Sequence, residues 1–207
     1  MSEALPGTNR IEAFSDGVIA IILTIMILDL KVPNDALAQG FWAGLLGPLL
    51  PKLIIYVLSF VVIAIIWVRH HHLLHAARHA TRPLLWSNIH LLLWMSIIPI
   101  TTALLGENPL SPIAVAVYGF VLAANAGAFM LLRWCIARDT RNDGGLMRLH
   151  VTMLQRGSFT IVLYALSVPL AFVSVYISLA IFVLMPLLFF LPDLLNGIGS
   201  PRHHKPH

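Results

Sequence analysis

The chain has 207 residues, of which 58% are hydrophobic and only 11% are charged, and its formal net charge is +4. A soluble domain carries about 25% charged residues, and one globular core could not hide this much apolar surface from water. The composition therefore excludes a soluble protein and predicts an all-α integral membrane protein.

The N-terminal segment 1–8 is polar and lacks the basic and short apolar regions of a signal peptide. We therefore expect the first hydrophobic segment to be a retained helix. The single cysteine, Cys135, excludes an intrachain disulfide and a multi-cysteine metal cluster.

A hydrocarbon core of about 30 Å takes roughly 20 apolar residues per helix. Segments of that length predict one six-helix domain over residues 1–207, with spans at 11–31, 53–72, 85–105, 110–133, 154–172 and 174–192. The last two come from one apolar run, in which Pro169, Ser174 and residues 176–178 predict a tight hairpin. Pro48 and Pro51 are expected just before the second helix.

Six spans place both termini on one side of the membrane. Eleven of the 13 Lys and Arg residues fall on that side, and only Lys31 and Lys52 fall on the other. The bias predicts cytoplasmic termini. It also explains the basic charge without a nucleic-acid partner, since no basic stripe lies on a polar domain.

Charged residues crowd the entrance of the first predicted helix. Arg10, Glu12 and Asp16 lie there, and charge at a bilayer is expensive. Glu12 has a simple explanation, because acidic side chains favour the positive end of a helix dipole. Asp16 lies about one and a half turns inside the helix and needs a polar partner. Candidates at the same depth on the second and third helices are Trp67, His70, His71, Asn88 and His90. A structural clamp between helices is favoured over a proton relay.

The middle of the first helix carries an aliphatic stripe. On a helical wheel one face holds Gly17, Ile21, Thr24, Ile25 and Leu28. Asp16 points away from this face. Most apolar stripes in membranes meet lipid or another helix, so the pattern alone favours a packing seam.

Histidines follow the second helix, and His71, His75 and His79 are spaced four residues apart. One helical face could therefore present imidazoles to a metal ion. No cysteine or carboxylate lies nearby along the chain, however, and three arginines between residues 69 and 82 add positive charge. We therefore predict no metal site.

Catalytic motifs are missing: the sequence has no nucleotide-binding loop, no G-x-S-x-G and no HExxH. We expect neither an enzyme nor a cofactor. The T-V-G-Y-G filter of potassium channels is also missing, and residues 101–106 do not resemble it. A channel with this sequence would need a filter built from side chains.

The charged entrance resembles the R-x-x-x-F-S-D signature of the transmembrane protein 175 family. Its members here are Arg10, Phe14, Ser15 and Asp16. Further similarities are Trp67 with His70-His71, Leu84-Leu85-Trp86-x-Asn88, and the segment from Pro99 to Glu107. The resemblance covers the first three helices, and the last three match in hydropathy.

This resemblance implies a passive, potassium-selective homotetramer in a prokaryotic plasma membrane, with the first helix lining a central pore. By position, the constriction maps to Ile21, Ile25 and Leu28, with Thr24 adjacent. Passage of K⁺ would cost partial dehydration, which favours potassium over the more strongly hydrated sodium. A hydrophobic neck also closes by dewetting, so that filter and gate coincide. Some members of the family also pass protons.

The polar clamp would hold the pore helices at the right radius, and its expected members are Arg10, Phe14, Ser15, Asp16, Trp67, His71 and Asn88. Asp29, near the extracellular mouth, either attracts cations or pairs with Lys31. Two other classes stay open. One is a proton-coupled or divalent-metal transporter that uses the histidine cluster, and the other is a scaffold whose stripe only packs.

Overall fold

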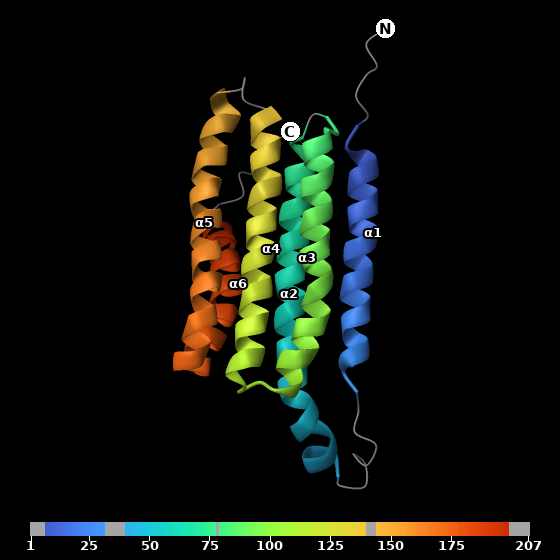
Figure 1. The fold of residues 1–207 in the computed structure, drawn as a ribbon, viewed down its shortest axis with the longest axis vertical. Helices are drawn as coiled ribbons and strands as arrows, with labels where there is room; N and C mark the ends of the chain where they lie inside the picture. Colours follow the sequence, from blue (N-terminus) through green and yellow to red (C-terminus); the bar gives the residue numbers. More distant parts are fainter. Residues whose placement is uncertain (1–6, 32–39, 78, 140–143, 199–207) are drawn as a thin grey trace, which may run out of the picture.

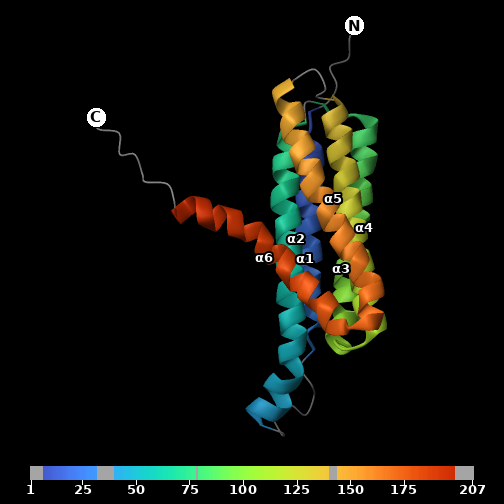
Figure 2. The same ribbon diagram turned by 90° about the vertical axis from the view of Figure 1, so that its left-hand side faces the viewer.

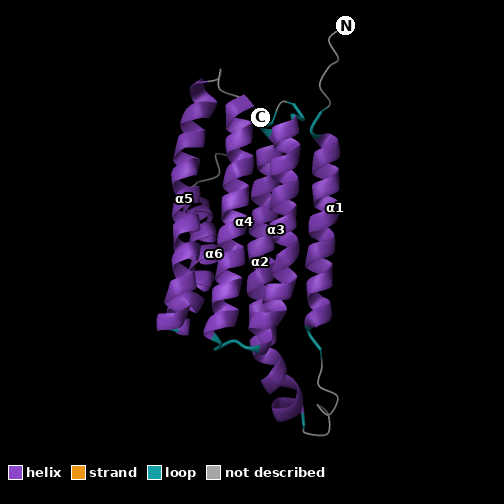
Figure 3. Cartoon of the chain, viewed as in Figure 1, coloured by secondary structure: helices purple, strands orange, loops and turns teal. Residues whose placement is uncertain are grey.

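The computed structural model describes residues 7–31, 40–77, 79–139 and 144–198, and no strand occurs among them (Figure 3). Six long helices carry the fold: α1 Asn9–Ile25, α2 Gly47–His75, α3 Arg82–Glu107, α4 Pro112–Asp139, α5 Gly144–Val173 and α6 Val175–Ile198. The prediction of an all-α chain with six helices is confirmed. Four basic residues used to predict the orientation lie outside the described residues: Arg78, Arg141, Arg202 and Lys205.

Four stretches are long and apolar enough to cross a membrane: Asn9–Asp29, Gly44–His75, Arg82–Glu107 and Pro112–Arg138. In the described parts of α5 and α6, the apolar stretches Gly157–Val173 and Val175–Phe189 are shorter. The chain is therefore a membrane protein with several spanning helices, while six full spans and cytoplasmic termini stay predictions.

The start of the second helix differs from the prediction, and the break between the last two helices agrees with it in part. The helix α2 begins at Gly47, after a π-helical stretch at Phe41–Leu46, so Pro48 lies in its first turn and Pro51 inside it, and neither lies before it. A proline near the start of a helix removes only one early backbone hydrogen bond. The break between α5 and α6 falls at Ser174, as predicted, whereas Pro169 lies within α5.

The first helix is shorter than predicted, because α1 ends at Ile25 and a 3₁₀ turn, Met26–Asp29, follows it. The Thr24 hydroxyl bonds back to the carbonyls of Ala20 and Ile21, each at 3.0 Å, an arrangement that often bends helices. A 3₁₀ turn has 3.0 residues per turn. The α-helical wheel therefore does not apply to Leu28.

Consecutive helices from α1 to α5 run antiparallel, with α1 at one edge of the bundle and α5 at the other (Figure 1). The neighbours of α1 are α2 and α3. Helix α6 begins beside α5 and then leaves the bundle at an angle (Figure 2). This order brings the start of α1, the end of α2 and the start of α3 to the same end of the molecule.

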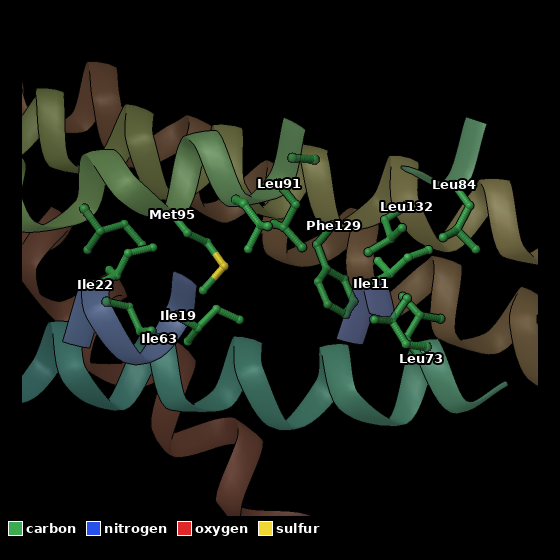
Figure 4. Close-up of a cluster of buried hydrophobic side chains, with 14 of the residues drawn as sticks. Ile11, Ile19, Ile22, Ile63, Leu73, Leu84, Leu91, Met95, Phe129 and Leu132 are labelled. Carbon is green, nitrogen blue, oxygen red and sulfur yellow. The ribbon is translucent and has the colours of Figure 1, made fainter. Parts of the chain in front are cut away.

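The inward face of α1 and of the 3₁₀ turn after it is a regular stripe of residues three or four apart: Ile11, Ser15, Ile19, Ile22 and Met26, all buried. It packs into a core formed with α2, α3 and α4, which is shown in Figure 4. Ile63, Leu91 and Met95 in this core are fully buried. Since lipid tails are as apolar as leucine, close packing rather than escape from water stabilises such helix contacts in a bilayer.

Candidate functional site

The outward face of α1 carries the aliphatic stripe. Ile21 is 57% exposed, Ile25 48% and Leu28 70%, whereas the adjacent Ile22 is only 5% exposed. Gly17 and Thr24 are exposed on the same side. Within one subunit, α1 is thus held by one face and leaves an uncovered apolar face on the other.

Thr24 is the polar residue in this face, between Ile21 and Ile25. Its hydroxyl hydrogen points back to the helix, where Oγ1 lies 3.0 Å from the carbonyl oxygens of both Ala20 and Ile21. A hydroxyl has two lone pairs in addition to its one donor. The oxygen can therefore still accept from, or coordinate, a group outside the helix.

A buried hydrogen-bond chain joins α1, α2 and α3 at the charged end. The Ser15 hydroxyl donates to the Ile11 carbonyl at 2.8 Å. Asn88 Nδ2 donates to Ser15 Oγ at 2.9 Å, and Asn88 Oδ1 lies 2.7 Å from His70 Nε2. Since the amide oxygen only accepts, this arrangement assigns the proton to His70 Nε2. All three side chains are buried, so the chain is a structural link between helices.

A second bond joins α1 to α2 one residue further along. Trp67 Nε1 donates to Asp16 Oδ1 at 2.8 Å. An indole N–H is a donor only, and a carboxylate accepts strongly. Asp16 thus has the inter-helix partner that its depth in the helix requires.

Glu12 makes the third contact between these helices. Its Oε1 lies 2.7 Å from His71 Nδ1 and 3.3 Å from His75 Nδ1. The rings of His71 and His75 are neighbours on α2, with centroids 4.4 Å apart. His71 therefore faces Glu12, whereas Asp16 faces Trp67.

Not every expected member of the clamp lies in this network. Phe14 is 59% exposed and Arg10 is also exposed. Among the described residues, neither side chain makes a hydrogen bond, ion pair or ring contact. His90, a candidate partner for Asp16, instead accepts from Trp94 Nε1 at 3.0 Å within α3.

At the other end of α1, Asp29 is exposed and borders a small pocket that Lys52 and Glu107 also line. Lys52 Nζ lies 4.0 Å from Glu107 Oε1. In the part of the chain that the structure describes, no ion pair joins Asp29 to Lys31. The expected alternative to cation attraction at Asp29 is therefore not formed within this subunit.

Sequence reasoning missed the roles of Glu12 and His75 and left His70 as one of several candidates. The signal was present, because Glu12 and Asp16 are four residues apart, as are His71 and His75. Residues at this spacing share a helix face. Two such pairs on adjacent antiparallel helices can meet, but the sequence does not say which faces meet.

Comparisons with known proteins fit this architecture. A family model described as the endosomal/lysosomal potassium channel TMEM175 matches residues 10–99. A potassium channel of Chryseobacterium sp. (strain P1-3) is 36% identical over 185 residues, covering 89% of this chain and 93% of the relative. A potassium channel of Streptomyces collinus is 39% identical over 182 residues, covering 84% and 86%. The crystal structure of a lysosomal potassium-selective channel TMEM175 homolog from Chamaesiphon minutus superposes with a TM-score of 0.78 at 30% identity, covering 89% of this chain and 97% of that one.

Proposed function

The chain belongs to the TMEM175 family of potassium channels, and from this membership we propose that it forms a homotetrameric, potassium-selective pore lined by the outward face of α1. Channel function and potassium as the permeant ion follow from the family. The relatives described above are channels and not enzymes. The whole chain, 1–207, would act as one channel domain in a prokaryotic plasma membrane.

The observation that carries the proposal is the uncovered apolar face of α1. Ile21 and Ile25 are about half exposed, and α1, which carries them, lies at the edge of the bundle (Figure 1). Four copies of this face around a central axis would cover one another and leave a narrow aliphatic neck. The family's potassium permeability favours this arrangement over a face that meets only lipid.

Selectivity in such a neck would come from partial dehydration. Ile21, Ile25 and Leu28 offer no oxygen to replace the water around an ion, so the less strongly hydrated potassium would pass more easily than sodium. Thr24 would add one ring of hydroxyl oxygens between the aliphatic rings. The same neck would close by dewetting, which makes it a hydrophobic gate.

The threonine side chains that follow Pro99 are occupied within the bundle. Thr101 and Thr102, in the segment that follows Pro99, are 3% and 6% exposed. Their hydroxyls bond to the Ile98 carbonyl, at 3.0 Å and 2.8 Å. They are used inside the subunit, which supports a filter built from the side chains of α1.

The test is a reversal-potential measurement on purified protein in liposomes under opposed potassium and sodium gradients. We expect a potassium-selective wild type and a loss of that preference in Ile21→Asn, because an amide ring would solvate both ions. Ile113→Asn is the matched control, since Ile113 is 66% exposed and belongs to α4 rather than to the outward face of α1. Its selectivity should be unchanged.

Unaltered selectivity in Ile21→Asn would move the filter away from α1. Saturating flux without single-channel steps would instead favour the transporter class, in which the histidine cluster carries protons or a divalent metal.

A further inference from the structure

Three potential metal ligands meet at the charged end of the α1–α2 contact. They are a carboxylate oxygen of Glu12 and the Nδ1 atoms of His71 and His75, all within 4.8 Å of one another. The sequence offers no carboxylate close to these histidines along the chain, and the structure brings one to them from a different helix. Glu12 is distant along the chain and adjacent in space.

The separations suit a transition metal. Zinc binds histidine nitrogen at about 2.0–2.1 Å and carboxylate oxygen at about 2.0–2.2 Å, which sets neighbouring tetrahedral ligands roughly 3.3 Å apart. Glu12 Oε1 lies 3.3 Å from His75 Nδ1 and 2.7 Å from His71 Nδ1. A small change in side-chain torsion would bring all three donors onto one ion.

The Nδ1 atom of His71 has the Glu12 carboxylate beside it but no aligned hydrogen bond. The atom is shielded from solvent, yet its 2.7 Å approach to Glu12 is not aligned as a hydrogen bond. A shielded polar atom without a well-directed partner is uncommon in native structures. An ion between the carboxylate and the two rings would satisfy this atom.

One of the three arginines that the sequence sets against a cation, Arg69, is directed to another helix. The Arg69 guanidinium lies 4.9 Å from the ring centroid of Phe129 on α4, so it is held by another helix and not by α1. The carboxylate of Asp16, one turn from Glu12, adds negative charge nearby. Glu12 itself is only 16% exposed, which limits the water that competes for the ion.

We propose that Glu12, His71 and His75 form a zinc-class site that fastens α1 to α2. Two imidazoles and one carboxylate are ligands that zinc uses in proteins, and a water molecule would complete the tetrahedron. Calcium and magnesium prefer all-oxygen ligands and would bind poorly. The metal would add a third, reversible link between α1 and its neighbours, beside the hydrogen bonds of Ser15 and Asp16.

Zinc binding to the full-length protein in detergent, purified without a polyhistidine tag, tests the site directly. We expect about one zinc per subunit after desalting, and a higher melting temperature with zinc than without. Loss of a partner that only supports a ligand weakens metal binding about 10–100-fold. His71→Gln and Glu12→Gln, which remove a ligand itself, should weaken it at least as much and abolish the zinc-induced shift.

Two controls separate this site from other histidines. His72→Gln changes an exposed neighbour on α2 that is not among the three donors. His203→Gln/His204→Gln/His207→Gln removes the C-terminal histidines, which lie outside the described residues. Both should keep full zinc binding and the melting shift.

The inference fails if the wild type retains no zinc. It also fails if either control variant loses as much zinc binding as His71→Gln does. A folding defect is separated by His75→Gln, because the His75 side chain is 60% exposed and its loss leaves the core unchanged. It should elute as the wild type does and still bind zinc weakly. Zinc binding is measured without ion flux, so a failure of the proposed pore would leave this result standing.

Discussion

Asn88 is the residue on which the contacts at the charged end converge. It is 1% exposed, donates to Ser15 of α1, and presents its amide oxygen to His70 of α2. A buried polar group without a partner costs about 1–3 kcal/mol. Asn88 therefore satisfies polar groups on two helices at once and sets where α1 sits relative to the bundle.

Asp16 offers the sharpest test at the residue scale. In Asp16→Ala the Trp67 indole loses its acceptor, and a bond to a charged group contributes about 1.5–3 kcal/mol. We expect fewer tetramers by size-exclusion chromatography, or altered gating, with the potassium-to-sodium permeability ratio of the surviving channels unchanged. Asp16 lies off the outward face of α1, which we propose lines the pore, so selectivity should not depend on it.

Asp16→Asn is the matched variant, because an amide oxygen can still accept from Trp67 Nε1. It should restore most of the assembly that Asp16→Ala loses. Wild-type yield of tetramers and normal flux in Asp16→Ala would contradict a clamp at this position.

At the scale of elements, α4 and α5 make the most extensive contact between helices of the bundle. The contacts of α1 with α2 and α3 are smaller. The α4–α5–α6 side is held by close approach at Gly119. A Cβ added there would collide with the Ser167 hydroxyl of α5 and lie 3.2 Å from the Phe182 ring of α6. Small residues that let helices approach closely are typical of membrane interfaces.

Gly119→Ala should therefore destabilise the subunit, even though alanine favours helix over glycine. Overpacking of a filled core costs about 1–3 kcal/mol. Gly127→Ala is the control on the same helix, since nothing lies within 4 Å of its added Cβ. A lower melting temperature in detergent for Gly119→Ala, with no loss for Gly127→Ala, is the expected result. Equal melting temperatures would mean that α5 and α6 can shift to accommodate the methyl group.

At the scale of the molecule, the unequal packing leaves α1 at an edge with its apolar face open (Figure 1). Four subunits sharing that face would explain why so apolar an edge carries a threonine. In such a tetramer, residues of the outward face of α1 approach their copies in the other subunits across the axis, whereas residues of the inward face cannot.

Cysteine cross-linking tests that demand. The native cysteine, Cys135, is first replaced by serine. In that background Ile21→Cys should form subunit dimers on mild oxidation, because a narrow neck brings the Cα atoms of neighbouring copies toward the roughly 4.4–6.8 Å that disulfides need. Ile19→Cys should not, since Ile19 is 1% exposed and faces the core of its own subunit. Dimers that form equally from both positions, or from neither, would argue against α1 as the shared face.

Much of this protein could be predicted from its sequence. Low charge and apolar runs of helix length determine a helical membrane protein, since only helices satisfy the backbone locally in lipid. The break at Ser174 followed from the length of the last apolar run. The stripe containing Ile21 and Ile25 followed from the helical period, and the signature from Arg10 to Asp16 identified the family. Each of these depends on residues close together along the chain.

The partners across helices were decided only by the tertiary structure. Helical period places Glu12 on a face but does not say that His71 and His75 lie opposite it. It also does not say that Trp67 bonds to Asp16, or that His70 bonds to Asn88. It also could not show that Arg10 and Phe14 stand outside the network. Such pairings depend on the rotation and depth of each helix against its neighbours. These are set by the summed packing of many side chains, as around Met95 and Leu91, and no local pattern encodes that sum.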